Sequence, residues 1–276
     1  MRLELGDRTH DLTRRALVMG ILNRTPDSFY DRGDYWDMDA FYSRAERLVA
    51  EGADVLDVGG VKAGLGPEVG EAEELDRVVP AIAGLHARFD LPLSVDTWRA
   101  SVAAEAYRAG AVVGNDISGF ADPDYLPAAA RAGATVVATH IRLGPRIPDP
   151  DPRYDDVVAE VARFLAERAG QASQAGIPDH RIIVDAGLDL GKTPAQSALL
   201  LRHSDRLAAL GWPLLLSASN KTFLGVAFDL AVGERGQATL AAHSLGVSLG
   251  CRLVRAHDVR GARRVCDTLA AVMGAS

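Results

Sequence analysis

Polar side chains stand at or just past the end of eight short apolar runs, and they are of types that bind ligands. These residues are Asn23, Asp57, Asp96, Asn115, His140, Asp185, Ser217 and His257. Any one of them has an ordinary explanation, because Asp and Asn often cap helices or close turns. Eight polar residues in corresponding positions are instead typical of one shared ligand site.

The first of these residues opens a turn-rich loop that could hold a metal. Asn23 and Asp27 bring an amide oxygen and a carboxylate to the segment 22–29. Such oxygens suit a hard cation, and Mg²⁺ is the cation that the pattern favours. The pattern alone is weak evidence, because Thr25-Pro26-Asp27 is also a common turn sequence.

The elements that would position these residues alternate regularly along the chain. The apolar runs, too short for helices, are 17–22, 55–58, 93–95, 112–113, 135–138, 182–184, 214–216 and 253–254. Segments of helical period lie between and after them, at 38–51, 71–89, 98–109, 125–132, 155–175, 195–210, 236–249 and 261–273. Short continuous apolar runs between amphipathic helices are typical of parallel strands buried on both faces.

Eight strand–helix units favour a closed (β/α)₈ TIM barrel over an open doubly wound sheet. No linker or low-complexity stretch interrupts them, so we expect residues 1–276 to form one domain. In such a barrel the carboxyl ends of the parallel strands share one face, where this fold builds its active sites. The polar strand ends are therefore expected to converge.

Composition excludes several classes of protein. The formal net charge of −7 argues against nucleic acid as a partner. Cys251 and Cys266 are too few for a disulfide scaffold or a four-cysteine zinc site, and both are expected in the core. No apolar run approaches the length of a membrane span, and segment 1–15 lacks the apolar core of a signal peptide, so a cytoplasmic location is expected.

Several motifs resemble those of the dihydropteroate synthase family. The most specific is Met19-Gly20-Ile21-Leu22-Asn23-Arg24-Thr25-Pro26-Asp27-Ser28-Phe29, which resembles the family's opening signature with Arg24 where Val is usual. The others, in order, are Gly52–Gly60, Ser94–Thr97, Asn115–Gly119, Asp185–Gly187, Gly191–Thr193, Ser219–Lys221 and Arg255–Val259. The resemblance covers residues 16–270.

The segment Gly191-Lys192-Thr193 also invites comparison with a phosphate-binding P-loop. Three residues separate Gly187 from Gly191, whereas that motif requires four, so Lys192-Thr193 is interpreted as the start of a helix.

The resemblance implies a reaction and a set of roles. Members of this family join p-aminobenzoate to a dihydropterin that carries a CH₂-diphosphate, and diphosphate leaves. By position, Asp96, Asn115 and Asp185 would hydrogen-bond the pterin edge, and Lys221 would donate to its carbonyl. Arg255 and His257 would hold the diphosphate, and Asn23 would ligate Mg²⁺. The resemblance also implies a homodimer and binding of sulfa-type ligands.

The departures from the family pattern cluster around the second substrate and the diphosphate. Where the family has Glu-Ser-Thr-Arg-Pro-Gly, this chain has Val61-Lys62-Ala63-Gly64-Leu65-Gly66. Asn220 replaces an arginine, and Asp189 and Leu190 replace the Gly-Phe pair before Gly191. Thr139 and Ile141 replace the methionines that flank the histidine.

Three functions are compatible with this pattern. The chain is expected to be a divergent relative that binds pterin with weak or lost condensing activity. The alternatives are a working synthase with a remodelled aminobenzoate loop, and another pterin function, either methyl transfer or non-catalytic binding.

Overall fold

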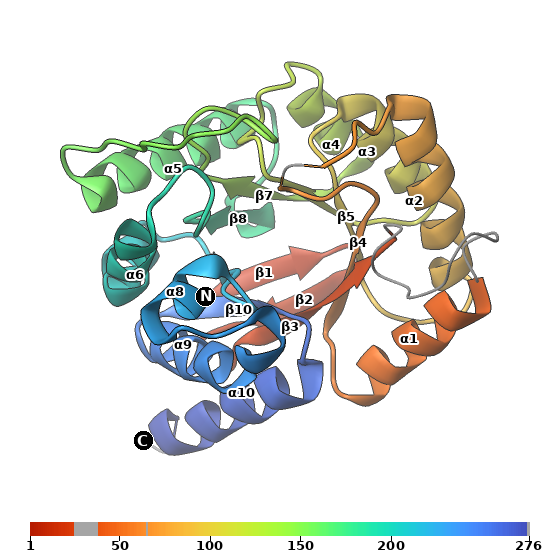
Figure 1. The fold of residues 1–276 in the computed structure, drawn as a ribbon. Coiled ribbons are helices and arrows are strands. Elements are labelled where there is room, and N and C mark those ends of the chain that lie inside the picture. Colours follow the sequence, from red (N-terminus) through yellow and green to blue (C-terminus); the bar gives the residue numbers. More distant parts are fainter. Residues whose placement is uncertain (25–37, 65, 275–276) are drawn as a thin grey trace.

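The eight apolar runs form a closed barrel of parallel strands in the computed structural model, which describes residues 1–24, 38–64 and 66–274 (Figure 1). The strands, in their order around the barrel, are β3 (Leu17–Asn23), β4 (Val55–Gly59), β5 (Leu93–Asp96), β6 (Val113–Asp116), β7 (Thr135–Thr139), β8 (Ile182–Asp185), β9 (Leu214–Leu216) and β10 (Cys251–Ala256). The last strand pairs with the first, from Leu253 opposite Leu17 to Ala256 opposite Gly20. The predicted barrel is therefore confirmed.

Helices surround the strands, and most of them lie where the sequence period predicts (Figure 1). They are α1 (Met38–Ala50), α2 (Glu71–His86), α3 (Ala100–Arg108), α4 (Tyr125–Ala132), α5 (Val157–Gln174), α6 (Pro194–Arg202), α7 (Ser204–Ala208), α8 (Thr222–Phe228), α9 (Gly236–Ser248) and α10 (Val259–Met273). The helix expected at 195–210 is broken at His203 into α6 and α7. The short helix α8 was not predicted, because seven residues carry too little periodicity.

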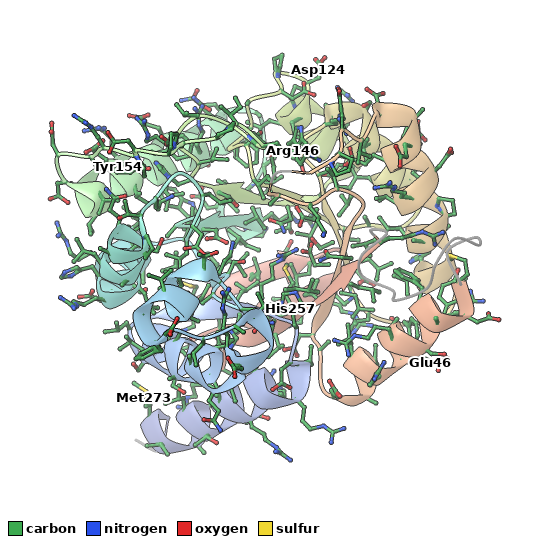
Figure 2. All side chains as sticks on the ribbon, viewed as in Figure 1. Glu46, Asp124, Arg146, Tyr154, His257 and Met273 are labelled. Atoms are coloured by element: carbon green, nitrogen blue, oxygen red, sulfur yellow. The ribbon has the colours of Figure 1, made fainter. Side chains whose placement is uncertain are left out.

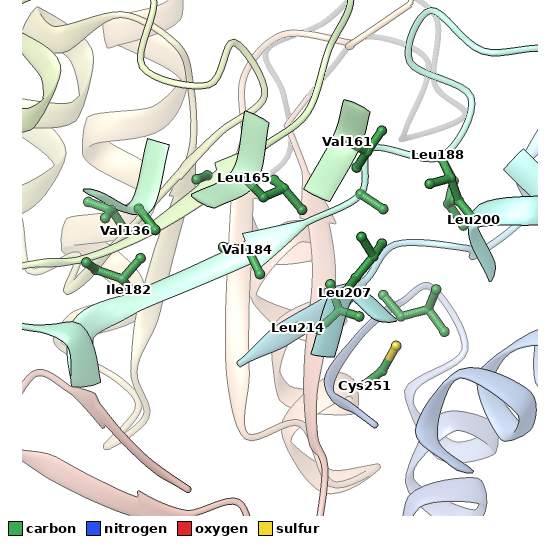
Figure 3. Packing of buried hydrophobic residues seen from close by; sticks show 14 of the residues in the cluster. Val136, Val161, Leu165, Ile182, Val184, Leu188, Leu200, Leu207, Leu214 and Cys251 are labelled. Atoms are coloured by element: carbon green, nitrogen blue, oxygen red, sulfur yellow. The ribbon is translucent and has the colours of Figure 1, made fainter. Parts of the chain in front are cut away.

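The barrel strands divide their side chains between two cores. Val136, Val184 and Leu214 belong to one cluster with residues of the surrounding helices, such as Leu165 of α5 and Leu207 of α7 (Figure 3). Their neighbours Val137, Ile183 and Leu215 belong to a separate cluster inside the barrel. Successive side chains of a strand point to opposite faces, so an unbroken apolar run fills both cores at once.

An antiparallel hairpin that the sequence did not predict adds to the core inside the barrel. It consists of β1 (Arg2–Leu5) and β2 (Arg8–Asp11), joined by a turn at Gly6, whose φ is +65°. Leu3, Leu5 and Leu12 are buried against the inward side chains of the barrel strands. The sequence did not predict that these three leucines cover the inner core, because charged residues interrupt the segment and leave no apolar run.

Both cysteines are buried, as expected, and they are not bonded to one another. Within the described residues, no helix is long and apolar enough to cross a membrane.

Candidate functional site

A pocket lies at the carboxyl ends of the barrel strands, and five of the predicted site residues line it together. We call it the inner pocket, and its lining consists of Ala63, Asp96, Asn115, Ile117, Thr139, Asp185, Gly187, Leu188, Leu190, Ser217, Lys221 and Arg255. Asp96 ends β5 and Asp185 ends β8, whereas Arg255 lies within β10. Of the eight strand-end residues, the pocket brings together Asp96, Asn115, Asp185 and Ser217, and it adds Lys221 and Arg255, which the family resemblance had indicated.

Arg255 is held by two carboxylates at one side of this pocket. Its Nε donates to Asp57 Oδ2 at 2.6 Å, and one terminal nitrogen donates to Asp96 Oδ2 at 2.7 Å. Asp57 is fully buried and also accepts from Ser94 Oγ at 2.5 Å and from Asn115 Nδ2 at 3.2 Å. Asp57 therefore links the Arg255 guanidinium to Ser94 and Asn115 through hydrogen bonds. Its position near a strand end did not predict this role.

The acids and the lysine of the pocket have shifted pKa values because they are removed from water. Burial raises the pKa of Asp96 to about 7, with Asp57 and Glu74 acting in the same direction and Arg255 opposing them. Burial also raises the pKa of Asp185, although the backbone N–H of Gly187 donates to its Oδ1 at 2.7 Å. Burial lowers the pKa of Lys221, against the field of Asp189 and Asp185. Such shifts gather at ligand sites, so the pocket is electrostatically suited to binding.

The loop after β8 is organised by Lys192 rather than by a phosphate. The buried Lys192 Nζ donates to Gly187 O at 2.8 Å and Leu190 O at 2.9 Å, and lies 2.8 Å from His140 Nδ1. Thr193 then caps α6 in a reciprocal arrangement with Gln196, which confirms the predicted helix start. Lys192 thereby fixes the backbone that presents Gly187, Leu188 and Leu190 to the inner pocket.

His140 does not line the inner pocket. It is buried, and its ring meets Phe164 edge-on at a centroid distance of 4.8 Å. Burial lowers the pKa of His140 to about 3, with Lys192 adding to the effect. Among the strand-end residues, His140 is therefore a packing residue.

His257 and Asn23 lie outside the lining of the inner pocket. His257 is exposed past the end of β10, and its Nδ1 lies 2.9 Å from Ser219 Oγ (Figure 2). Asn23 ends β3, and a β-carbon at Gly59 would lie 3.2 Å from Asn23 Oδ1 and 3.5 Å from Asp96 Oδ2. Asn23 and Asp96 therefore flank the end of β4.

Few side chains that could hold a metal ion gather in the described part of this region. In the described ranges, no group of three or more His, Cys, Asp or Glu side chains is placed to hold a metal ion. Asn23 Oδ1 offers one amide oxygen near the pocket, which suits a cation that takes most of its ligands from substrate and water. The rest of the predicted opening loop, Thr25–Phe29, lies outside the described residues.

A second hollow adjoins the inner pocket and shares Ala63, Leu190 and Lys221 with it. We call it the outer groove, and its lining consists of Ala63, Gly64, Ile141, Leu143, Gly144, Arg146, Ile147, Asp149, Asp189, Leu190, Gly191, Lys192, Asn220, Lys221 and Thr222. These residues come from the loops after β4, β7, β8 and β9. Several of these positions depart from the family pattern in the sequence. The sequence did not predict that they line one groove.

Three arginines hold the loop between β4 and α2, which is the loop that lacks the family's Ser-Thr-Arg. Arg77 donates to Gly60 O at 2.7 Å, and Arg99 donates to Val69 O at 2.8 Å. Arg146, labelled in Figure 2, donates from the loop after β7 to Gly66 O and to Pro67 O, the latter at 2.7 Å. The replaced loop is thus anchored from α2, from the start of α3 and from the far side of the outer groove.

A TIM barrel with acids, an amide and a lysine converging on one pocket defines a ligand-binding α/β barrel, and comparison with known proteins specifies its family. The chain belongs to the pterin-binding enzyme family, whose pattern matches residues 19–257. It is a dihydropteroate-synthase-like pterin-binding protein, as the sequence motifs predicted.

The relatives include proteins named dihydropteroate synthase and proteins named inactive dihydropteroate synthase 2. The chain is 44% identical to "Inactive dihydropteroate synthase 2" of Mycobacterium leprae over 94% of its own length and 91% of that protein. It resembles the dihydropteroate synthase of Yersinia pestis, solved in complex with a sulfonamide drug, with a TM-score of 0.93 and 36% identity over the whole of both chains. The dihydropteroate synthase of Xanthomonas albilineans, solved with 4-aminobenzoic acid, gives a TM-score of 0.91 and 40% identity over 100% of this chain and 99% of that one.

Proposed function

We propose that this protein binds a pterin in the inner pocket and condenses it with p-aminobenzoate weakly or not at all. The observation that carries the proposal is the contrast between two groups of residues. The predicted pterin contacts line one pocket, whereas the cations expected for the diphosphate are replaced or are already bonded inside the protein.

The pterin half of the site has the chemistry that the ring requires. Asp96, Asn115 and Asp185 supply oxygen acceptors and an amide donor for the N–H and ring nitrogen groups of a pterin. Lys221 supplies an ammonium group for its carbonyl oxygen. Leu188 and Leu190 provide apolar surface for the faces of the ring. The pocket thus combines polar groups for the edge of a flat ring with apolar side chains for its faces.

The part of the site that would bind the diphosphate has fewer available cationic donors than the family pattern provides. The Nε and one terminal nitrogen of Arg255 are bonded to Asp57 and Asp96, so these two donors are occupied before any anion arrives. The loop 61–66 carries no arginine, and Asn220 stands where the family has one.

The loss can be expressed as an affinity. A hydrogen bond to a charged group contributes about 1.5–3 kcal/mol, so two missing guanidinium contacts weaken diphosphate binding by about two to four decades. Turnover suffers further, because the leaving group gains negative charge in the transition state.

The remaining expectations are part of the same proposal. Asn23 would ligate a Mg²⁺ ion that completes its shell with diphosphate oxygens and water, and the ion would neutralise part of the leaving-group charge. His257, oriented by Ser219, would contact the diphosphate from outside the pocket. We also propose one domain over residues 1–276, a homodimer, a cytoplasmic location and the capacity to bind p-aminobenzoate or sulfa-type ligands.

The proposal is tested by two measurements on the same preparation. Calorimetric titration with the dihydropterin diphosphate and Mg²⁺ reports binding, and product formation after adding p-aminobenzoate reports condensation. We expect binding that Asp185→Asn abolishes, together with turnover at least two decades below that of a dihydropteroate synthase measured in parallel. Turnover equal to that enzyme's, or absence of pterin binding, would refute the proposal.

A further inference from the structure

Four large aliphatic side chains line the outer groove, beside its charged and polar residues. Ile141, Leu143, Ile147 and Leu190 line it, and Leu143 and Ile147 are 51% and 56% exposed. Large aliphatic side chains that line a concave surface next to a ligand pocket favour an apolar ligand group.

Asp189 bonds to the backbone at one end of this groove. Its carboxylate accepts from the backbone N–H of Thr222, and from that of Phe223 at 3.4 Å. Thr222 lines the groove and directly follows Lys221. The bonds therefore occupy backbone donors that border the groove and place a negative charge beside them.

The backbone at Asp189 is held in a conformation that few residues adopt. Its φ is +66°, in the left-handed region, where Asp and Asn are the side chains that are best tolerated after Gly. Its own N–H is bonded to Ser197 Oγ at 3.0 Å. The side chain is thus fixed by its backbone on one side and by the start of α8 on the other.

Three of the other four charged side chains of the lining are bonded within the protein, and the fourth, Lys221, is shared with the inner pocket, where it is assigned to the pterin carbonyl. Arg146 donates to carbonyl groups of the loop between β4 and α2, and Asp149 accepts from Arg142 at 2.6 Å. Lys192 donates to Gly187 O and Leu190 O. An anionic ligand in the groove therefore competes with internal partners and lies near Asp189.

We propose that the outer groove accepts an uncharged apolar group, such as a neutral arylamine, and that Asp189 makes it select against a carboxylate. This inference rests on the proposed function, because the groove opens onto the pocket that is assigned to the pterin. It specifies the class of second ligand, and it assigns to Asp189 the determination of that specificity.

The test compares two probes of nearly equal shape that differ in charge. Protein saturated with 6-hydroxymethylpterin is titrated with 4-aminobenzamide, which is neutral, and with 4-aminobenzoate, which is anionic. We expect 4-aminobenzamide to bind at least about tenfold more tightly to the native chain.

Asp189→Asn removes the charge and keeps an oxygen that can accept from the N–H of Thr222. In this variant the ratio of the two dissociation constants should fall to within about threefold of one, because like-charge repulsion is lost. Asp124→Asn is the control, since it makes the same substitution at the start of α4, outside the groove, and its ratio should equal that of the native chain. Ile147→Ser should weaken both probes to the same extent.

Equal or tighter binding of 4-aminobenzoate by the native chain would overturn the inference, as would an unchanged ratio in Asp189→Asn. Absence of binding by both probes would also overturn it. The first titration, with the pterin alone, reports separately on the proposed function.

Discussion

Replacing Asp57 by Asn tests whether the buried network is arranged as described. The side chain is fully buried, and its Oδ2 receives Arg255 Nε at 2.6 Å and Asn115 Nδ2 at 3.2 Å. If the new amide keeps its oxygen towards Ser94, its NH₂ group faces both of these donors. The substitution therefore removes a charge and sets donors against one another without changing the size of the side chain.

The magnitude follows from these contacts. Breaking a buried ion pair by removing one partner costs about 3–5 kcal/mol, but Arg255 remains bonded to Asp96, so we expect about 2–4 kcal/mol. The free energy of unfolding is measured by urea denaturation at pH 7.5. Glu105→Gln is the control, because Glu105 pairs with Arg108 on the surface and its loss should cost less than about 1 kcal/mol.

A second measurement distinguishes the loss of this ion-pair network from a general destabilisation of the core. The charge of Asp57 helps to raise the pKa of Asp96, so Asp57→Asn should lower that pKa from its value of about 7. The Asp96 carboxyl signal is followed by NMR as a function of pH. A stability loss below about 1 kcal/mol, or a pKa of Asp96 that stays the same or rises, would refute the reasoning.

Three further predictions concern pH, the loop after β8 and the hairpin. Because the folded pKa of Asp96 is raised from 3.8 to about 7, the native state holds an extra proton between these values, and stability should fall as pH rises through that window. Asp96→Asn should flatten this dependence in urea titrations, and an unchanged slope would contradict it. Lys192→Met should weaken binding of a pterin analogue in calorimetry at least about tenfold, since the donors to Gly187 O and Leu190 O are lost; native affinity would show that the loop does not need them. Leu5→Ala should cost about 2–5 kcal/mol in unfolding experiments and leave pterin affinity unchanged, because Leu5 is buried in the hairpin core and lines neither hollow. A marked loss of affinity would show that the two regions are coupled.

The barrel and its pocket could be predicted because each depends on a repeated local pattern. Parallel strands buried on both faces require continuous apolar runs, and their carboxyl ends must meet once the sheet closes. Asp96, Asn115 and Asp185 therefore meet at one pocket, and Lys221 and Arg255, which the family resemblance indicated, line it with them.

The remaining features depend on contacts between segments that are distant in the chain. That Arg255 is bonded to Asp57 and Asp96 depends on how three strands are placed across the barrel. The spacing from Gly187 to Gly191 excluded a P-loop at Lys192, but it did not show that Lys192 Nζ donates to backbone carbonyl groups. The hairpin was not predicted because β1 and β2 have only four residues each. The burial of the nearby leucines depends on contacts with the inner core of the barrel, which lies far away in the sequence. The bond from Asp189 to α8 was invisible because α8 itself was not predicted.

The pairing of β10 with β3 has a consequence for how the chain is made. Leu253 is synthesised long after its partner Leu17, so the barrel cannot close until β10 has been made. Until then, β3 and β9 carry unpaired edges of the kind that recruit other strands. A chain that ends before Cys251 would therefore be an open sheet with two such edges. By pairing with both β3 and β9, β10 covers the two edges that could otherwise recruit strands of other chains.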